Sequence, residues 1–178
     1  MANKVYTAAE TKITFVDPSV ASGADYVTFL PAGLPNGSGW ISDPRDLGEF
    51  PSPSLFRWRA KTKSQGSPVL GGTVEIYWMG FDDPAELSAA TGLLFGADGN
   101  LSSGNHMLGD FNRKRNLQWV GSVAVDRAQS NVPFTNSGLC YLYGRYGSVV
   151  FWNETGSTLS TQSDANAFSL TPVPDEIQ

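Results

Sequence analysis

The sequence predicts an all-β fold, an antiparallel β-sandwich of about eight strands with a jelly-roll-like arrangement. Three observations support this prediction. Apolar residues recur at every second position in several segments, clusters of Gly, Pro, Asn and Asp separate these segments, and only one short stretch carries a helix start signal. Side chains alternate between the two faces of a strand, so a period of two indicates strands with one buried face. An immunoglobulin-like sandwich is the second choice, although its Cys…Trp…Cys signature is absent.

The first half of the chain is expected to hold four strands. Weak patterns indicate strands at residues 12–16 and 25–30, and residues 1–24 include a partly extended N-terminal segment. Strong alternation follows at residues 55–63 and 73–79. In the segment 55–63 apolar or small residues alternate with basic ones, and we name these basic residues the basic ladder: Arg57, Arg59, Lys61 and Lys63.

A short helix is predicted near residues 84–91, because Asp83 is a suitable N-cap and Pro84 suits the first helical position. Residues 93–106 are expected to form a long loop. The next strand is predicted at residues 117–125, with Gly121 at a bulge or a close-packing point. Its pattern places these residues on one face: Leu117, Trp119, Val123 and Val125.

In the segments 139–143 and 148–152, nearly all residues on both faces of the expected strand are apolar. Such segments fit central strands, or strands whose outer face is covered by a partner. A last weak strand at residues 167–171 completes a single domain, residues 1–171. Residues 172–178 are predicted to form an arm, because Pro172 and Pro174 remove alternate backbone donors.

The composition excludes several classes of function. Only 16% of the 178 residues are charged, against roughly 25% in an ordinary soluble protein, which suits a subunit that lies against neighbours. The net charge of −5 argues against nucleic acid as a partner. No segment is long and apolar enough to span a bilayer and the N-terminus has no secretory signal, so no membrane partner is expected.

No catalytic, cofactor-binding or metal-binding set is found. His106 is the only histidine, and both a serine triad and a multi-histidine metal site require more. Cys140 lies in an apolar strand, which favours an inert buried thiol. A glycosidase needs two carboxylates, whereas Glu75 projects from its strand alone and Asp82 and Asp83 are adjacent, which normally points them apart. The loop around Asp98 offers oxygen ligands for a cation but lacks calcium-hand spacing.

Three features are candidates for an interface: the basic ladder, Trp40 in a predicted loop, and the C-terminal arm with Pro172, Pro174, Asp175 and Glu176. The basic ladder is either a solvated outer face or a face that pairs with carboxylates of a neighbour, and Asp175 and Glu176 are one candidate partner. Trp40 stands in a segment rich in Gly and Pro. There it can anchor a partner, stack on a sugar, or close the end of the sandwich.

Several segments together resemble small virion structural proteins of tailed bacteriophages, of the jelly-roll head decoration (cement) kind. The resemblance rests on residues 57–61, 74–78, 144–150, 153–156 and 168–178 within the range 54–178. It implies a non-enzymatic protein, a homotrimer that clamps neighbouring copies of the major capsid protein, assembled in the host cytoplasm and resident on the virion. The alternatives are a carbohydrate-binding or receptor-binding module, suggested by Trp40 and the loop around His106, and a hydrolase.

Overall fold

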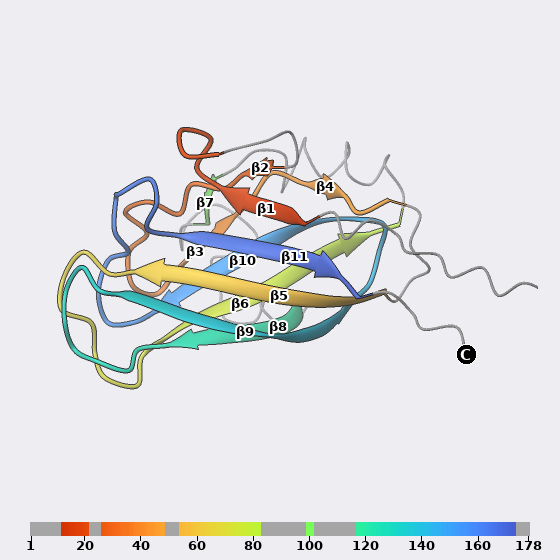
Figure 1. Cartoon of the computed structure of the whole chain (residues 1–178). Helices are drawn as coiled ribbons and strands as arrows, with labels where there is room; N and C mark the ends of the chain where they lie inside the picture. The colour runs from red at the N-terminus through yellow and green to blue at the C-terminus, as the bar shows by residue number, and fades with distance from the viewer. Residues whose placement is uncertain (1–11, 22–25, 49–53, 83–98, 102–116, 174–178) are drawn as a thin grey trace, which may run out of the picture.

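The computed structural model describes residues 12–21, 26–48, 54–82, 99–101 and 117–173. In these ranges the chain forms eleven strands and no helix, and the strands make two packed sheets (Figure 1). The strands are β1 (Ile13–Val16), β2 (Tyr26–Thr28), β3 (Ser38–Ile41), β4 (Arg45–Asp46), β5 (Ser54–Lys63), β6 (Thr73–Phe81), β7 (Gly99–Leu101), β8 (Gln118–Ala124), β9 (Pro133–Leu142), β10 (Tyr146–Glu154) and β11 (Ala167–Pro172). The predicted helix near residues 84–91 lies outside the described residues.

The two sheets, here called sheet A and sheet B, confirm the predicted β-sandwich. Sheet A has the order β2-β1-β11-β5-β9, and sheet B has the order β7-β3-β10-β6-β8, with β4 also paired to β10. In the described residues the strand pairs are antiparallel except for β1 with β2, which run parallel. Strands that are consecutive in the chain therefore often lie in different sheets, as β5 and β6 do.

The core lies between the sheets and is dominated by aromatic side chains. Phe15 of sheet A meets Trp78 of sheet B edge to face, with 6.4 Å between ring centroids. Phe168 of sheet A likewise contacts Phe151 of sheet B at 6.2 Å. Such pairs stabilise a core beyond their burial of apolar area. One continuous cluster of buried residues extends from Ile13 to Leu170, so both sheets share one core.

Two tryptophans of this core lie in slots that glycines leave open. A Cβ atom at Gly121 would lie 2.3 Å from Cζ2 of Trp58, and one at Gly138 would lie 2.8 Å from its indole nitrogen. A Cβ atom at Gly147 would meet Cζ2 of Trp78 at 2.2 Å. The prediction that Gly121 marks a close-packing point is confirmed.

The prediction for the face of residues 117–125 is wrong in one half of the strand. The register between β6 and β8 shifts at a bulge, because Ile76 pairs with Gly121 while Tyr77 pairs with Trp119. The extra residue, Val120, inverts the alternation, as bulges do. Val123 and Val125 are buried in the core, whereas Trp119 points outward, is 52% exposed and packs edge to face on Tyr77.

One interpretation placed residues 139–143 in a central strand, and this is wrong. They belong to the end of β9 and the residue after it, and β9 is the edge strand of sheet A. Residues 148–152 are central as predicted: β10 lies between β3 and β6 and is buried on both faces. The two apolar segments thus have different environments, because β10 has a strand on each side and β9 lies at an edge.

Two further expectations are corrected. Trp40 lies in β3, where it pairs with Phe151 of β10, and its half-buried side chain packs against the core. Its loop placement was wrong because pairing with a distant strand overrides the low strand propensity of the segment. Pro172 is not part of an arm: it ends β11 opposite Phe56 of β5.

Candidate functional site

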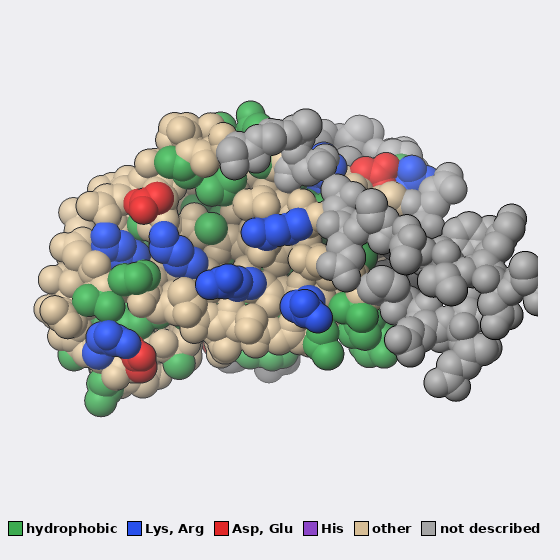
Figure 2. Space-filling view, viewed as in Figure 1, with side chains coloured by type: hydrophobic (Ala, Val, Ile, Leu, Met, Phe, Trp, Pro, Cys, Tyr) green, Lys and Arg blue, Asp and Glu red, His purple; other side chains and the backbone are tan. Residues whose placement is uncertain are grey.

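The basic ladder lies on the outer face of sheet A. Along β5 the alternate residues Phe56, Trp58 and Ala60 are buried in the core, so the basic residues between them point away from it. Figure 2, seen from the sheet A side, shows a row of Lys and Arg side chains over β5, with apolar surface beside one end of the row. The prediction that these four residues share one face is confirmed.

The lysines of the ladder are engaged within the chain. The ammonium group of Lys61 donates to the backbone oxygen of Asp164 at 2.6 Å and lies 3.8 Å from its carboxylate. The ammonium group of Lys63 donates to the side-chain oxygen of Gln162. Both acceptors belong to the segment between β10 and β11, so this half of the ladder stabilises that segment against sheet A.

The arginines of the ladder differ from the lysines. Arg57 and Arg59 are exposed, and in the part of the chain that the structure describes neither guanidinium has a carboxylate within ion-pair distance. Across the strands Arg57 faces Thr171, and Arg59 faces Ser169 and Ser137. We call Arg57 and Arg59 the arginine pair. It is a local positive charge on a chain whose net charge is −5.

An apolar surface adjoins the arginine pair, within the segment 139–143 that the sequence analysis found apolar on both faces. Leu139, Tyr141 and Tyr143 are 62%, 56% and 58% exposed, and we call them the apolar patch. Leu139 lies directly opposite Arg57, and Tyr141 lies opposite Leu55. The signal for this patch was present in the sequence, because a strand that is apolar on both faces needs cover on both.

The backbone under the apolar patch is held by side chains of β8. The Gln118 amide donates to the backbone oxygen of Tyr141 and accepts from the Tyr143 N–H at 3.2 Å. Farther along, the Asn136 amide donates to the backbone oxygen of Ser122 at 2.7 Å. These bridges join the edges of the two sheets and satisfy groups that an open edge strand would expose.

The C-terminal candidates are only partly described. After Pro172 the Val173 N–H donates to the backbone oxygen of Leu55 at 2.9 Å, so the chain stays on sheet A to this point. Pro174, Asp175 and Glu176 lie outside the described residues. Their assignment to an interface stays a prediction.

The catalytic candidates are in settings that favour structural roles. Cys140 faces the core, and burial raises the pKa of its thiol to about 12. The Glu75 carboxylate accepts the Tyr77 hydroxyl at 2.9 Å, and burial together with this hydrogen bond raises the pKa of Tyr77. His106 and Asp83 lie outside the described residues.

A second acid near Glu75 was missed. Glu154 of β10 lies two residue pairs from Glu75 on the outer side of sheet B, because Trp152 is paired with Glu75 and Glu154 with Thr73. Its carboxylate accepts the Trp152 indole N–H at 2.7 Å. Both carboxylates thus serve as acceptors for neighbouring aromatic side chains. Local spacing could not reveal the pair, because Glu75 and Glu154 come from distant segments.

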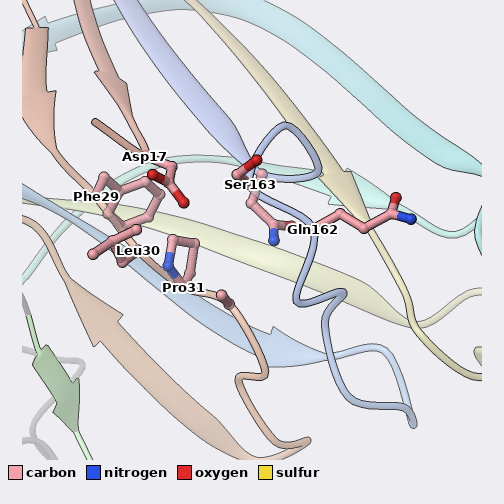
Figure 3. Close-up of a pocket in the computed structure, with 8 residues that line it drawn as sticks. Asp17, Phe29, Leu30, Pro31, Gln162 and Ser163 are labelled. Atoms are coloured by element: carbon pink, nitrogen blue, oxygen red, sulfur yellow. The ribbon is translucent and has the colours of Figure 1, made fainter. Parts of the chain in front are cut away.

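A small cavity and an open groove are the candidates for ligand sites. The first, drawn in Figure 3, lies between the segment after β2 and the segment before β11, where Pro31 and Ser163 line it. Its volume of about 10 Å³ is roughly that of one water molecule. The second is an open groove of about 230 Å³ beside the β9–β10 turn, lined among others by Asp82, Gln118 and Tyr143. Neither cavity is lined by Glu75 or Glu154.

Within the described ranges, no three His, Cys, Asp or Glu side chains gather as a metal site would require. The same ranges contain no helix with the length and apolar character needed to cross a membrane. In comparisons of the chain with known proteins, no family model, no curated protein and no solved structure matches it.

Proposed function

We propose that the chain is a non-enzymatic virion structural protein that decorates and stabilises a phage capsid by binding between neighbouring capsid subunits. The jelly-roll topology, the homotrimer and the major capsid protein as partner belong to this proposal. The apolar patch is the observation that supports it best. Large exposed apolar side chains that adjoin one another mark interaction sites, and Tyr and Arg are enriched where interfaces gain most of their binding energy.

The position of the apolar patch suits a rigid docking surface. Its residues Tyr141 and Tyr143 are anchored through their backbone by Gln118, and Leu139 stands beside Arg57. A partner that covers the patch loses little conformational freedom in this chain, because the underlying strands are already fixed. Many copies on one lattice then add their modest affinities by multivalency.

The test is binding of the purified chain to intact phage particles from its source, measured as bound copies per particle after pelleting. The double variant Leu139→Ser/Tyr141→Ser should bind at least tenfold more weakly, because its apolar anchors are lost. Val69→Ser/Leu70→Ser is a matched control, since these residues are 60% and 65% exposed and lie on the turn between β5 and β6. Equal binding by the patch variant and the control would refute this use of the patch.

A carbohydrate-binding function is the second candidate. Its original basis has weakened, because Trp40 packs against the core and residues 102–106 lie outside the described part. The exposed rings of Trp119, Tyr141 and Tyr143 now favour it, since sugars stack on such surfaces. A glycan array on which Tyr141→Ser abolishes a signal, together with no saturable binding to particles, would replace the capsid proposal with this one.

A further inference from the structure

The arginine pair is a charged surface without a partner in the described chain. The guanidinium groups of Arg57 and Arg59 lie on one face of β5, two residues apart, and their cross-strand neighbours on both sides are Leu, Ser and Thr. The lysines of the same ladder are already engaged by Gln162 and the backbone and carboxylate of Asp164. Among the described residues the arginine pair has no carboxylate partner. It is therefore the part of this face where carboxylates of another segment can bind.

The chain itself carries adjacent carboxylates close to this face. Asp175 and Glu176 follow Val173, the last described residue, whose N–H bonds the backbone oxygen of Leu55. Leu55 is on β5, two residues from Arg57. The described chain therefore ends on sheet A beside Leu55, at the end of β5 nearest to the arginine pair.

The direction of β11 disfavours a contact within the same chain. Thr171 is paired with Arg57, and from there β11 runs toward Leu55 and away from Arg59. Pro174 restricts Val173 to extended conformations, so a reversal at that point is disfavoured. Asp175 is four residues beyond Thr171, and an extended chain of four residues spans about 13 Å. Arg59 lies farther still, because it is paired with Ser169, and an extended chain of six residues from Ser169 to Asp175 spans about 20 Å. That distance exceeds the reach of an ion pair, so an extended chain end cannot pair with both arginines of its own copy.

We propose that residues 174–178 of one copy bind the arginine pair of a second copy, with the carboxylates of Asp175 and Glu176 paired to the guanidinium groups of Arg57 and Arg59. The contact is carried by the cationic part of the face and does not depend on which partner covers the apolar patch. Capture of an acidic segment by a cluster of arginines is a known mode of peptide recognition. Because each copy offers one segment and one arginine pair, the contact is head-to-tail and gives a ring of copies where the rotation between them closes.

The first measurement uses a labelled peptide of residues 171–178 and the chain that lacks residues 174–178. We expect saturable binding by fluorescence anisotropy, weaker at least tenfold in Arg57→Ala/Arg59→Ala and weakened by added salt. Lys61→Ala/Lys63→Ala is the matched control from the same ladder and should bind the peptide within about twofold of the unchanged chain. Equal binding by both double variants would overturn the assignment of the arginines.

The second measurement is the mass of the complete chain by light scattering, which needs no capsid. The unchanged chain should be an oligomer, and both Arg57→Glu/Arg59→Glu and Asp175→Arg/Glu176→Arg should lower its mass to that of the monomer. Combining the two charge reversals in one chain should restore the oligomer. A monomeric unchanged chain whose peptide still binds the arginine pair would mean a contact within one copy and would overturn the proposal. Loss of particle binding without a change of mass would concern the proposed function alone.

Discussion

Gly121 shows how one missing side chain fixes the position of a large one. The Trp58 indole occupies the space that a Cβ atom at Gly121 would enter, at 2.3 Å from Cζ2. We predict that Gly121→Ala lowers the free energy of unfolding by roughly 1–3 kcal/mol, because Trp58 must move within a packed core. Urea unfolding followed by tryptophan fluorescence measures the change. The control Ser122→Ala, next along β8, should alter it by no more than about 0.5 kcal/mol.

The same residue scale explains why the face of Trp119 could not be predicted. A period of two assigns Trp119 and Val123 to one side, and only an inserted residue changes this. Gly121 signalled an irregularity, but the sequence contains nothing that places the extra residue at Val120 rather than elsewhere. The bulge becomes visible only in the register with β6, where Ile76 and Tyr77 face Gly121 and Trp119.

At the scale of elements, segments with an apolar period of two were predictable as strands, including the weakly patterned segments that form β1, β2 and β11, whereas β3 was not. The strands β5 and β6 follow their apolar periods closely because one face of each packs in the core. Strand β3 was missed because its sequence, Ser38-Gly39-Trp40-Ile41, is typical of a loop. Its pairing with β10 comes from residues more than a hundred positions away, and such long-range pairing overrides local propensity.

The sequence also could not distinguish an edge strand from a central strand. The segments that became the end of β9 and β10 are both rich in aromatic and apolar residues, yet only β10 has strands on both sides. The sequence required cover for both faces of both segments, and it did not specify whether this cover comes from the chain or from a partner. The apolar patch of the candidate site therefore had a signal in the sequence, whereas its place at an edge had none.

The bridge made by Gln118 gives a prediction about this edge. In Gln118→Ala the Tyr143 N–H loses its acceptor and the backbone oxygen of Tyr141 loses its donor. We expect the amide of Tyr143 to exchange with solvent roughly fivefold faster, since one exposed hydrogen bond contributes about 1 kcal/mol. Hydrogen exchange followed by NMR measures this rate.

Gln118→Glu is the matched control for this bridge. Its carboxylate keeps an acceptor for the Tyr143 N–H but has no donor for the backbone oxygen of Tyr141. Protection of the Tyr143 amide should therefore stay close to that of the unchanged chain. If the Tyr143 amide exchanges no faster in Gln118→Ala than in Gln118→Glu, the Gln118 side chain does not hold the edge of β9.

At the scale of the whole molecule, Cys140 reports how cooperatively the two sheets hold together. Its thiol faces the core opposite Phe56, and β9 is paired with β5 along its full length. With its pKa raised to about 12, the native thiol carries about a thousandfold less thiolate at pH 8 than an ordinary cysteine. Reaction with a thiol reagent therefore requires β9 to leave the core.

We predict that native Cys140 reacts at least roughly a thousandfold more slowly than an unfolded cysteine, as expected if β9 leaves the core only when the domain unfolds. The logarithm of the labelling rate should then rise with urea with the slope of global unfolding by circular dichroism. The control is Leu139→Cys in a Cys140→Ser chain, whose thiol stands on the exposed face of the same strand and should react at once. A labelling rate of Cys140 that does not depend on urea would mean that β9 opens by itself, which would weaken its suitability as a rigid docking edge.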